Sequence, residues 1–355
     1  MFSNKFGRFL FGLYSRKAAA VCGVTRSGFS WTAVCKQRTL WLRRSACVET
    51  PRSTVPCHTS VRSASQTTVD PDEVRRFQSL ASKWWDEQGE FAALHAMNDL
   101  RVPFIRDNLL NVHTTRHPGK PLAGLRILDV GCGGGLLTEE EGTVVHMSLS
   151  PLVLHKPLGR LGANVLGIDP VEQSVGTAQL HSSYDPDLHD RVCYRACTLE
   201  ELSAVEEEEE GQFDAVVASE VVEHLADLET FAFCCSTVLK PGGSLFITTI
   251  NKTNLSYALG IVVAEQLLRI VPSGTHDWEK FISPVELERL LESNGFSVQS
   301  VQGMLYNPLS GAWCWTDGTA INYALHAVKL RDDPQPDQAE ESGSHPEEHT
   351  AATHS

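Results

Sequence analysis

The sequence contains no C-x-x-C pair and no basic patch in its main part. Its ten cysteines are scattered, and those in the main part lie among apolar or small residues, so we interpret them as reduced packing residues. A net positive charge is confined to residues 1–69, whereas the chain as a whole carries −14. A nucleic-acid-binding protein needs a basic surface on its folded body. We therefore expect no nucleic-acid partner.

Acidic residues are almost absent from residues 1–69, where Glu49 stands against eleven Lys and Arg residues. Basic residues alternate there with bulky apolar ones, Ser and Thr are plentiful, and no unbroken apolar stretch resembles a secretory signal. This composition predicts a mitochondrial transit peptide, with a basic tail that carries no address as the alternative. The acidic, Pro-rich and His-rich residues 331–355 are expected to be disordered. Residues 70–330 remain as one folded domain.

No apolar run is long enough to span a membrane. The most apolar segment, residues 255–271, has 17 residues and includes Glu265 and Arg269. It fits an interfacial helix or a lid over a hydrophobic substrate, with Trp278 as an anchor at the headgroups. A buried crossover helix is the alternative.

Glycines follow a short apolar stretch in Arg-Ile-Leu-Asp-Val-Gly-Cys-Gly-Gly-Gly, residues 126–135. The pattern predicts a buried parallel strand and then a loop that approaches a ligand, because Gly131, Gly133 and Gly135 can adopt positive φ. A dinucleotide fingerprint needs its third glycine at position 136, which is Leu136. The G-x-G-x-G spacing is instead typical of S-adenosylmethionine (SAM) sites. An ordinary tight strand–helix turn is the alternative.

Strand-like segments alternate with helical ones, which predicts a parallel sheet with right-handed crossovers. The last two segments have no long helix between them and are expected to pair antiparallel at the sheet edge. Together they describe an α/β, Rossmann-like class I methyltransferase architecture with a seven-stranded, mostly parallel sheet and a C-terminal antiparallel hairpin. The expected strands are Arg126–Gly131, Asn164–Asp169, Arg191–Thr198, Phe213–Ser219, Gly243–Ile250, Ser297–Leu305 and Ile321–Leu330.

One helix is clearly bounded in the sequence. Ser283-Pro-Val-Glu286 has the form of a capping box with proline at the first helical position, and Asn294-Gly295 supplies a stop. We predict a helix over about 284–294. The side chains expected to face the sheet are Val285, Leu287, Leu290 and Leu291.

An unusual segment separates the first two predicted strands. The acid that binds a ribose normally follows the first strand by about 20 residues, whereas Asp169 lies 40 residues after Asp129. Residues 136–139 and 157–163 look like pieces of the connecting helix, but residues 140–156 have no helical period. We interpret 140–156 as an insertion that interrupts the helix beneath the glycine loop, or as a gene-model artefact, and it puts the activity of this chain in question.

Acidic and imidazole side chains follow the fourth predicted strand, in Ser219-Glu-Val-Val-Glu-His-Leu225. On a helix, Glu220 would lie beside both Glu223 and His224. These ligands predict a divalent-metal cluster, since carboxylate oxygens suit Mg²⁺ and imidazole admits Zn²⁺. An acidic helix start, with His224 capping or packing, is the alternative. Asp169, at the end of the second strand, is expected to accept hydrogen bonds from ribose hydroxyls, with a helix N-cap as the alternative.

Taken together, these motifs resemble the mitochondrial ubiquinone-biosynthesis O-methyltransferase family. The resemblance covers about residues 70–330, and segment 140–156 is not part of the family's pattern. The segments that match in order are Met97–Arg101, Ile127–Thr138, Pro157–Pro170, Ser219–Leu225, Leu239–Asn251, Thr275–Phe281 and Gly303–Pro308.

The resemblance implies a SAM site formed by Arg101, Gly131, Asp169 and Ser219. The guanidinium of Arg101 would pair with the methionine carboxylate of SAM, for which its planar fork is suited. The resemblance also implies Mg²⁺ or another divalent cation at the positions of the predicted metal cluster, Glu220, Glu223 and His224.

The implied reaction is SAM-dependent methylation of ring hydroxyls on 3,4-dihydroxy-5-polyprenylbenzoate and on demethylubiquinol. A bound metal would lower the pKa of the catechol as a Lewis acid, or His224 would act as general base. Because such substrates reside in lipid, the resemblance implies peripheral contact with the matrix side of the inner mitochondrial membrane. It also implies other ubiquinone-biosynthesis proteins as partners.

Three other functions remain to be weighed against this one. A nicotinamide-dependent oxidoreductase is disfavoured by Leu136 and would bind NADH. A non-catalytic SAM-binding scaffold in the same biosynthetic complex is compatible with the interruption at 140–156. A quinone C-methyltransferase would share the fold and differ in its product.

Overall fold

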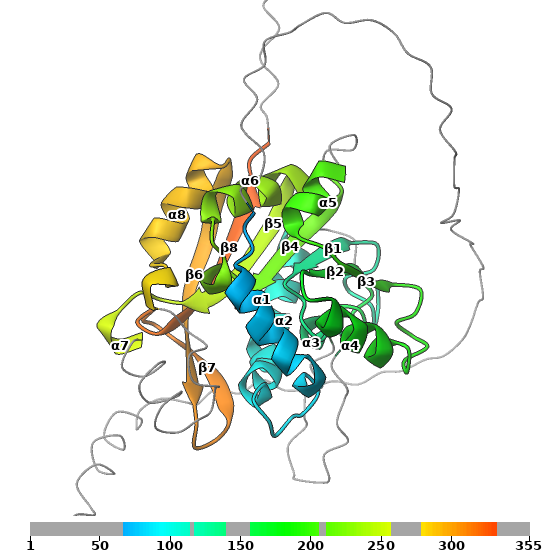
Figure 1. The fold of residues 1–355 in the computed structure, drawn as a ribbon. Coiled ribbons are helices and arrows are strands. Elements are labelled where there is room, and N and C mark those ends of the chain that lie inside the picture. Colours follow the sequence, from blue (N-terminus) through cyan, green and yellow to red (C-terminus); the bar gives the residue numbers. More distant parts are fainter. Residues whose placement is uncertain (1–66, 114–116, 140–156, 206–210, 257–277, 332–355) are drawn as a thin grey trace, which may run out of the picture. The chain divides into compact units, whose positions relative to one another are not determined.

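An eight-stranded sheet lies at the centre of the residues that the computed structural model describes, 67–113, 117–139, 157–205, 211–256 and 278–331 (Figure 1). The strands are β1 Arg126–Val130, β2 Asn164–Asp169, β3 Val192–Ala196, β4 Phe213–Ser219, β5 Leu239–Ile250, β6 Phe296–Asn307, β7 Ala312–Thr316 and β8 Asn322–Lys329. The α-helices are α1 Pro71–Leu80, α2 Ala92–Val112, α3 Leu136–Glu139, α4 Glu172–Ser182, α5 Leu199–Val205, α6 Leu228–Val238, α7 Asn254–Ser256 and α8 Pro284–Ser293. The 3₁₀ helices in the described part of the chain are η1 Ala81–Lys83, η2 Val222–His224 and η4 Trp278–Lys280.

The strands lie in the order β3-β2-β1-β4-β5-β8-β6-β7. The first five run parallel, and β8, β6 and β7 pair antiparallel with their neighbours. This arrangement confirms the predicted mostly parallel α/β sheet with antiparallel strands at its C-terminal side. The order of the strands reverses between β1 and β4. In open α/β sheets, ligands bind at such a reversal, outside the carboxyl ends of the strands.

The strand β7 was not predicted, so the described sheet has eight strands where seven were expected. A tight turn leads into it, in which Gly311 has a φ of 66° and its N–H donates to Asn307 O at 2.9 Å. β7 pairs with β6 and forms the edge of the sheet, where the last two predicted strands were expected to lie. Its five residues are only partly buried, so no clear apolar alternation marks it in the sequence.

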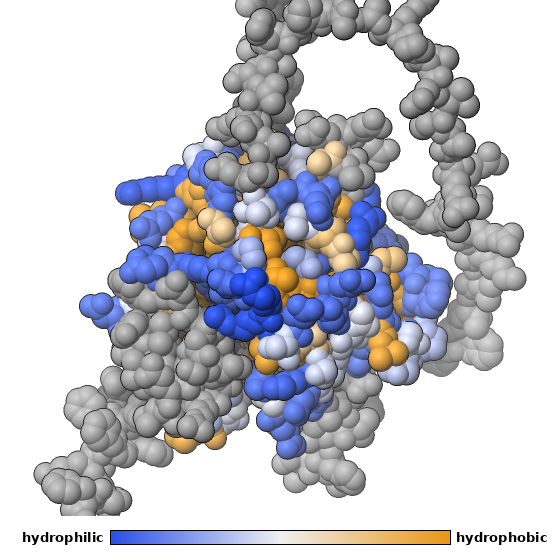
Figure 2. Space-filling view, viewed as in Figure 1, coloured by the Kyte–Doolittle hydropathy of each residue, from blue (hydrophilic) through white to orange (hydrophobic). Residues whose placement is uncertain are grey.

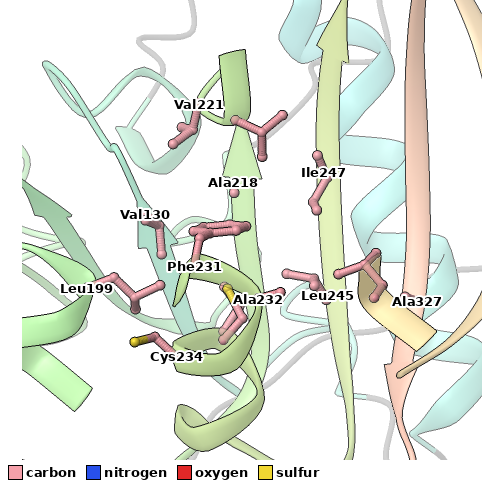
Figure 3. Packing of buried hydrophobic residues seen from close by; sticks show 14 of the residues in the cluster. Val130, Leu199, Ala218, Val221, Phe231, Ala232, Cys234, Leu245, Ile247 and Ala327 are labelled. Carbon is pink, nitrogen blue, oxygen red and sulfur yellow. The ribbon is translucent and has the colours of Figure 1, made fainter. Parts of the chain in front are cut away.

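Alternate side chains of the central strands pack on opposite faces of the sheet. Leu128 belongs to the layer covered by α5, α6 and α8, and Ile127 belongs to the layer covered by α2, α3 and α4. Figure 3 shows part of the first layer, where Phe231 of α6 lies close to Val130 and Ala218. Burial on both faces explains why these strands appear in the sequence as nearly continuous apolar runs.

The helix α8 begins and ends where the sequence predicts. Ser283 Oγ accepts the Glu286 N–H at 3.3 Å, and Glu286 Oε2 accepts the Ser283 N–H at 3.1 Å, which completes the capping box. Leu287 and Leu291 are fully buried against the sheet. Val285, expected to face the sheet, is 54% exposed. It precedes Leu287 by two residues, which places it on nearly the opposite side of the helix.

The two ends of segment 140–156 meet at one place in the fold. Leu158 N–H donates to Leu137 O at 3.4 Å, and both leucines are buried beside the sheet. Residues 157–163, which looked helical in the sequence, form turns instead, and Gly162 there has a φ of 99°. Segment 140–156 itself lies outside the described residues, so the insertion stays a prediction.

Other sequence predictions also fall outside the described residues. They concern residues 1–66 of the transit peptide predicted over 1–69, the apolar segment from residue 257, the side chain of Trp278, and residues 332–355 of the acidic tail predicted over 331–355. Among the helices that the structure describes, none combines the length and apolar character that crossing a bilayer requires.

Candidate functional site

The loop after β1 has the backbone that its glycines predict. The φ angles of Gly131, Gly133 and Gly135 are 67°, 53° and 87°. Gly133 N–H donates to Asp169 Oδ2 at 3.0 Å, which fastens the loop to the end of β2. The glycine loop and Asp169 therefore lie together at the carboxyl edge of the sheet, as expected for a nucleotide-like ligand.

Asp169 is held by two backbone groups. Besides Gly133, Val171 N–H donates to its Oδ1 at 2.8 Å. Asp169 as a residue is 9% exposed, and burial raises the pKa of its carboxyl to about 6 although both backbone bonds oppose the shift. The helix α4 has Val171 at its N-cap position, so the alternative role of Asp169 as a helix N-cap is not observed.

Arg101 and Ser219 meet although 118 residues separate them. Arg101 Nη1 donates to Ser219 Oγ at 2.8 Å, and Arg101 Nε donates to Asn98 Oδ1 at 2.6 Å within α2. Ser219, at the end of β4, also shares a hydrogen bond of 2.7 Å with Thr248 Oγ1 of β5. Arg101 is 5% exposed, so its guanidinium has a defined orientation. The structure thus brings two of the predicted SAM contacts together.

Trp84 and Trp85 lie against the glycine loop, a contact that no pattern in the sequence predicted. A Cβ atom on Gly133 would come within 2.5 Å of the Trp84 ring, and one on Gly134 within 2.3 Å of Trp84 Cβ. Trp85 Nε1 donates to Gly134 O at 3.0 Å, and Phe91 stacks on Trp84 with ring centroids 3.9 Å apart. The glycines are therefore needed for close approach as well as for positive φ. No sequence motif predicts this packing, because the tryptophans and the glycine loop lie far apart along the chain.

The predicted metal cluster is only partly assembled. Glu223 is buried, and burial together with the neighbouring charge of Glu220 raises the pKa of its carboxyl well above the usual range. Thr249 Oγ1 donates to Glu223 Oε2 at 2.8 Å, whereas Oε1 has no hydrogen-bond partner among the described residues. Two close carboxylates with an unsatisfied buried oxygen fit a cation.

His224 contacts the helix α1 through one of its ring nitrogens. Its Nδ1 lies 3.3 Å from Glu73 Oε2 of α1, and no group of three His, Cys, Asp or Glu side chains in the described ranges has metal-binding spacing. The cluster was expected because, on a helix, Glu220 would lie beside both Glu223 and His224. Instead Glu220 precedes the 3₁₀ helix η2 and has a φ of 56°. The prediction that Glu220, Glu223 and His224 are neighbours on one helix is therefore wrong.

Glu220 is the only residue other than glycine with a positive φ in the described part of the chain. Its N–H donates to Thr248 O at 2.9 Å, and this bond helps to keep the backbone in the left-handed region. Such a conformation costs about 1–2 kcal/mol for a residue with a side chain. Strained backbone of this kind gathers at functional sites, where it places a side chain that relaxed backbone would not.

Two variants separate this strain from charge repulsion. Glu220→Gly and Glu220→Gln both remove the carboxylate beside Glu223, but only glycine relaxes the backbone. At pH 8 we expect both variants to unfold at a higher urea concentration than the wild type. The free energy of unfolding of the glycine variant should exceed that of the glutamine variant by about 1 kcal/mol. Equal free energies of unfolding for the two variants would show that the left-handed conformation stores no strain.

Asp129 supplies a pH dependence of stability. It is 3% exposed, and burial raises its pKa to about 7, although the charge of Arg101 and the 3.1 Å hydrogen bond from Thr138 oppose the shift. The unfolded chain loses this proton near pH 4, so the folded protein loses stability between pH 4 and pH 7, by an amount on the order of 4 kcal/mol.

We expect Asp129→Asn to raise the melting temperature at pH 8 and to change it little at pH 4.5. The amide keeps the acceptor for Thr138 but has no charge to bury. Thermal unfolding of both proteins at the two pH values measures the difference. An equal gain at both values would contradict the buried ionisation.

Known proteins similar to this chain agree with the geometry. A family model described as a methyltransferase domain matches residues 103–301. The mitochondrial ubiquinone biosynthesis O-methyltransferase of Homo sapiens is 63% identical over 278 residues, which are 78% of this chain and 70% of that protein. The corresponding protein of Rattus norvegicus is 56% identical over 303 residues, 83% of this chain and 80% of its own length. The ubiquinone biosynthesis O-methyltransferase of Azorhizobium caulinodans is 41% identical over 271 residues, 75% and 96% of the two chains.

The match to the human protein, at 63% identity over 278 residues, is high enough to establish a common fold. These similarities also exclude the nicotinamide-dependent oxidoreductase. The chain therefore belongs to the ubiquinone biosynthesis O-methyltransferase family and is a SAM-dependent methyltransferase.

Proposed function

We propose that this protein methylates ring hydroxyls of 3,4-dihydroxy-5-polyprenylbenzoate and of demethylubiquinol in ubiquinone biosynthesis, with SAM as the donor. The observation that carries the proposal is the convergence of the glycine loop, Asp169 and the Arg101–Ser219 pair where the strand order reverses. The names of the relatives, which call them ubiquinone biosynthesis O-methyltransferases, supply the substrate class.

SAM is held by four of these residues in our proposal. Arg101 pairs with the methionine carboxylate, and Ser219 keeps the guanidinium in place through their 2.8 Å hydrogen bond. Gly131 lets the backbone approach the donor. Asp169 uses the second lone pair of each carboxylate oxygen for the ribose hydroxyls, since its bonds to Gly133 and Val171 occupy only one per oxygen.

The acceptor oxygen attacks the methyl carbon of the sulfonium in line, the methyl–sulfur bond breaks, and the sulfur keeps the electron pair. The catechol must first lose a proton. We propose that Glu220, Glu223 and His224 hold Mg²⁺ or another divalent cation, with the unsatisfied oxygen of Glu223 as one ligand. Such a cation lowers the pKa of the phenol as a Lewis acid. His224 as general base is the second route, and full activity of His224→Ala at high Mg²⁺ would exclude it.

The proposed cellular location of the protein rests on its N-terminal composition and on its lipid-soluble substrate. We propose import into mitochondria through the transit peptide within residues 1–69, a methyltransferase domain over 70–330 and an acidic tail over 331–355. A polyprenyl tail resides in lipid, so the protein works at the matrix side of the inner membrane, with residues 255–271 at the interface and other ubiquinone-biosynthesis proteins nearby. The names of the mammalian relatives include the word mitochondrial.

To test this proposal, the full chain is incubated with methyl-labelled SAM, Mg²⁺ and a dihydroxybenzoate that carries a short prenyl chain. We expect label on a ring oxygen, identified by mass spectrometry and by NMR of the product. Label on a ring carbon would instead identify a quinone C-methyltransferase. Binding of SAM without any transfer would identify a scaffold, and the same assay on a 140–156 deletion shows whether that segment blocks the reaction.

A further inference from the structure

Glu73 of α1 is a buried carboxylate to which neither the sequence motifs nor the proposed reaction assigns a task. It is 8% exposed, and its Oε2 lies 3.3 Å from Nδ1 of His224, 151 residues further along the chain. The contact is close enough for an ion pair, although it is not a linear hydrogen bond. A carboxylate beside one ring nitrogen of a histidine is the arrangement that fixes which nitrogen carries the proton.

Two cations flank this carboxylate. Arg76 Nη1 donates to Glu73 Oε2 at 2.9 Å, and Lys280 Nζ of η4 lies 3.5 Å from Oε1. Lys280 also donates to Asp70 Oδ2, the N-cap residue of α1, at 2.7 Å. These contacts leave the position of the Glu73 carboxylate well defined, which it needs if it is to orient an imidazole.

The start of α1 is fastened to the same turn that carries His224. Val69 forms a β-bridge with Leu225, and Ala226 N–H donates to Thr68 O at 2.8 Å. These backbone contacts place residues 68–73 directly beside η2. Figure 2 shows hydrophilic residues over the exposed side of α1. Glu73 itself is buried and is therefore shielded from solvent by its neighbours.

A second side chain of α1 reaches the same imidazole. Phe77 lies one helical turn after Glu73, and its ring meets that of His224 edge to face, with centroids 5.1 Å apart and an interplanar angle of 86°. Residues four apart share one face of a helix. His224 is thus held by a carboxylate at one nitrogen and by an aromatic ring at its edge.

We propose that Glu73 is the positioning residue of His224. Its negative charge, 3.3 Å from Nδ1, favours the tautomer with the proton on that nitrogen. Nε2, the other nitrogen, then keeps the lone pair that binds a cation or takes a proton from the substrate. The inference rests on the proposed function for its consequence in catalysis, but the tautomer of His224 is a property of this chain alone. A purely structural ion pair that anchors α1 is the competing explanation.

The first readout is the tautomer itself. Full-length protein labelled with ¹⁵N-histidine is examined by NMR at pH 8, and the His224 signals are assigned with a His224→Gln variant. We expect Nδ1 to carry the proton in the wild type and the population to shift toward Nε2–H in Glu73→Gln. Glu73→Asp keeps the charge on a shorter arm and should be intermediate. An unchanged tautomer in Glu73→Gln would overturn the proposal.

The second readout separates positioning from folding and from donor binding. We expect Glu73→Gln to lower kcat by roughly 10- to 100-fold and to weaken Mn²⁺ binding, measured by electron paramagnetic resonance, by a similar factor. The dissociation constant of S-adenosylhomocysteine should stay within twofold. The control is Asp72→Asn, an exposed acid of the same helix that pairs with Arg75, and it should change none of these values.

Failure of the two proposals can be told apart. If kcat and Mn²⁺ affinity in Glu73→Gln match the wild type while the melting temperature falls, Glu73 only anchors α1 and the positioning role is wrong. If the wild type transfers no methyl group but its His224 tautomer depends on Glu73, the proposed reaction is wrong and the positioning role stands.

Discussion

Replacement of Gly133 by alanine is expected to weaken SAM binding by roughly 100-fold, about 2.7 kcal/mol. The backbone at Gly133 has a φ of 53°, which costs about 1–2 kcal/mol for a residue with a side chain. The added Cβ would also lie 2.5 Å from the Trp84 ring. That ring cannot move aside easily, because Phe91 stacks on it and its Nε1 donates to Ser174 Oγ at 3.0 Å. Isothermal calorimetry with S-adenosylhomocysteine measures the loss.

Gly176→Ala is the matched control. Gly176 lies on the exposed side of α4, where a Cβ would meet no heavy atom within 4 Å. We expect unchanged donor affinity and a gain in stability of about 0.5–1 kcal/mol, since alanine is the better helix former. If Gly133→Ala bound the donor as well as Gly176→Ala does, the loop would not be the donor site.

Arg101→Lys should have a comparably large effect despite the conserved charge. The guanidinium reaches Ser219 and Asn98 through two different nitrogens, at 2.8 Å and 2.6 Å. A lysine ammonium is a single point and cannot hold both while it also pairs with a carboxylate of the donor. We expect kcat/KM for SAM to fall by roughly 100-fold, about 2.7 kcal/mol.

The control for charge and helix position is Arg106→Lys, which lies on α2 as well. Arg106 pairs with its neighbour Asp107 at 2.7 Å near the surface, where an ion pair contributes little. Its kcat/KM should stay within twofold of the wild type. A similar loss in both variants would mean that α2 is disturbed in general and that Arg101 has no particular role in donor binding.

Local patterns were sufficient for most of the sheet and for the backbone conformation of the glycine loop. Strands buried on both faces appear as apolar runs, glycines mark a backbone with positive φ, and Ser283 with Glu286 marks a helix start. In each case the deciding interaction lies within a few residues along the chain, so the sequence displays it directly. The pairing of Arg101 with Ser219 was reached only through the resemblance to a family, because 118 residues separate the two.

The missed features depend on contacts between distant segments. Trp84 packs on the glycine loop, and Glu73 meets His224, yet nothing near either residue in the sequence announces its partner. The positive φ of Glu220 is a further example, since its N–H bonds to Thr248 on the neighbouring strand. The helical spacing of Glu220, Glu223 and His224 was misleading, because tertiary contacts rather than helix periodicity set the backbone there.

The most direct test of the account is a competition experiment on the full chain. S-adenosylhomocysteine is titrated into the wild type and into Gly133→Ala by calorimetry, with NADH as competitor. We predict one S-adenosylhomocysteine bound per chain, unaffected by NADH and weakened by about two orders of magnitude in the variant. Absence of binding to the wild type, or displacement by NADH, would contradict a donor site at the glycine loop.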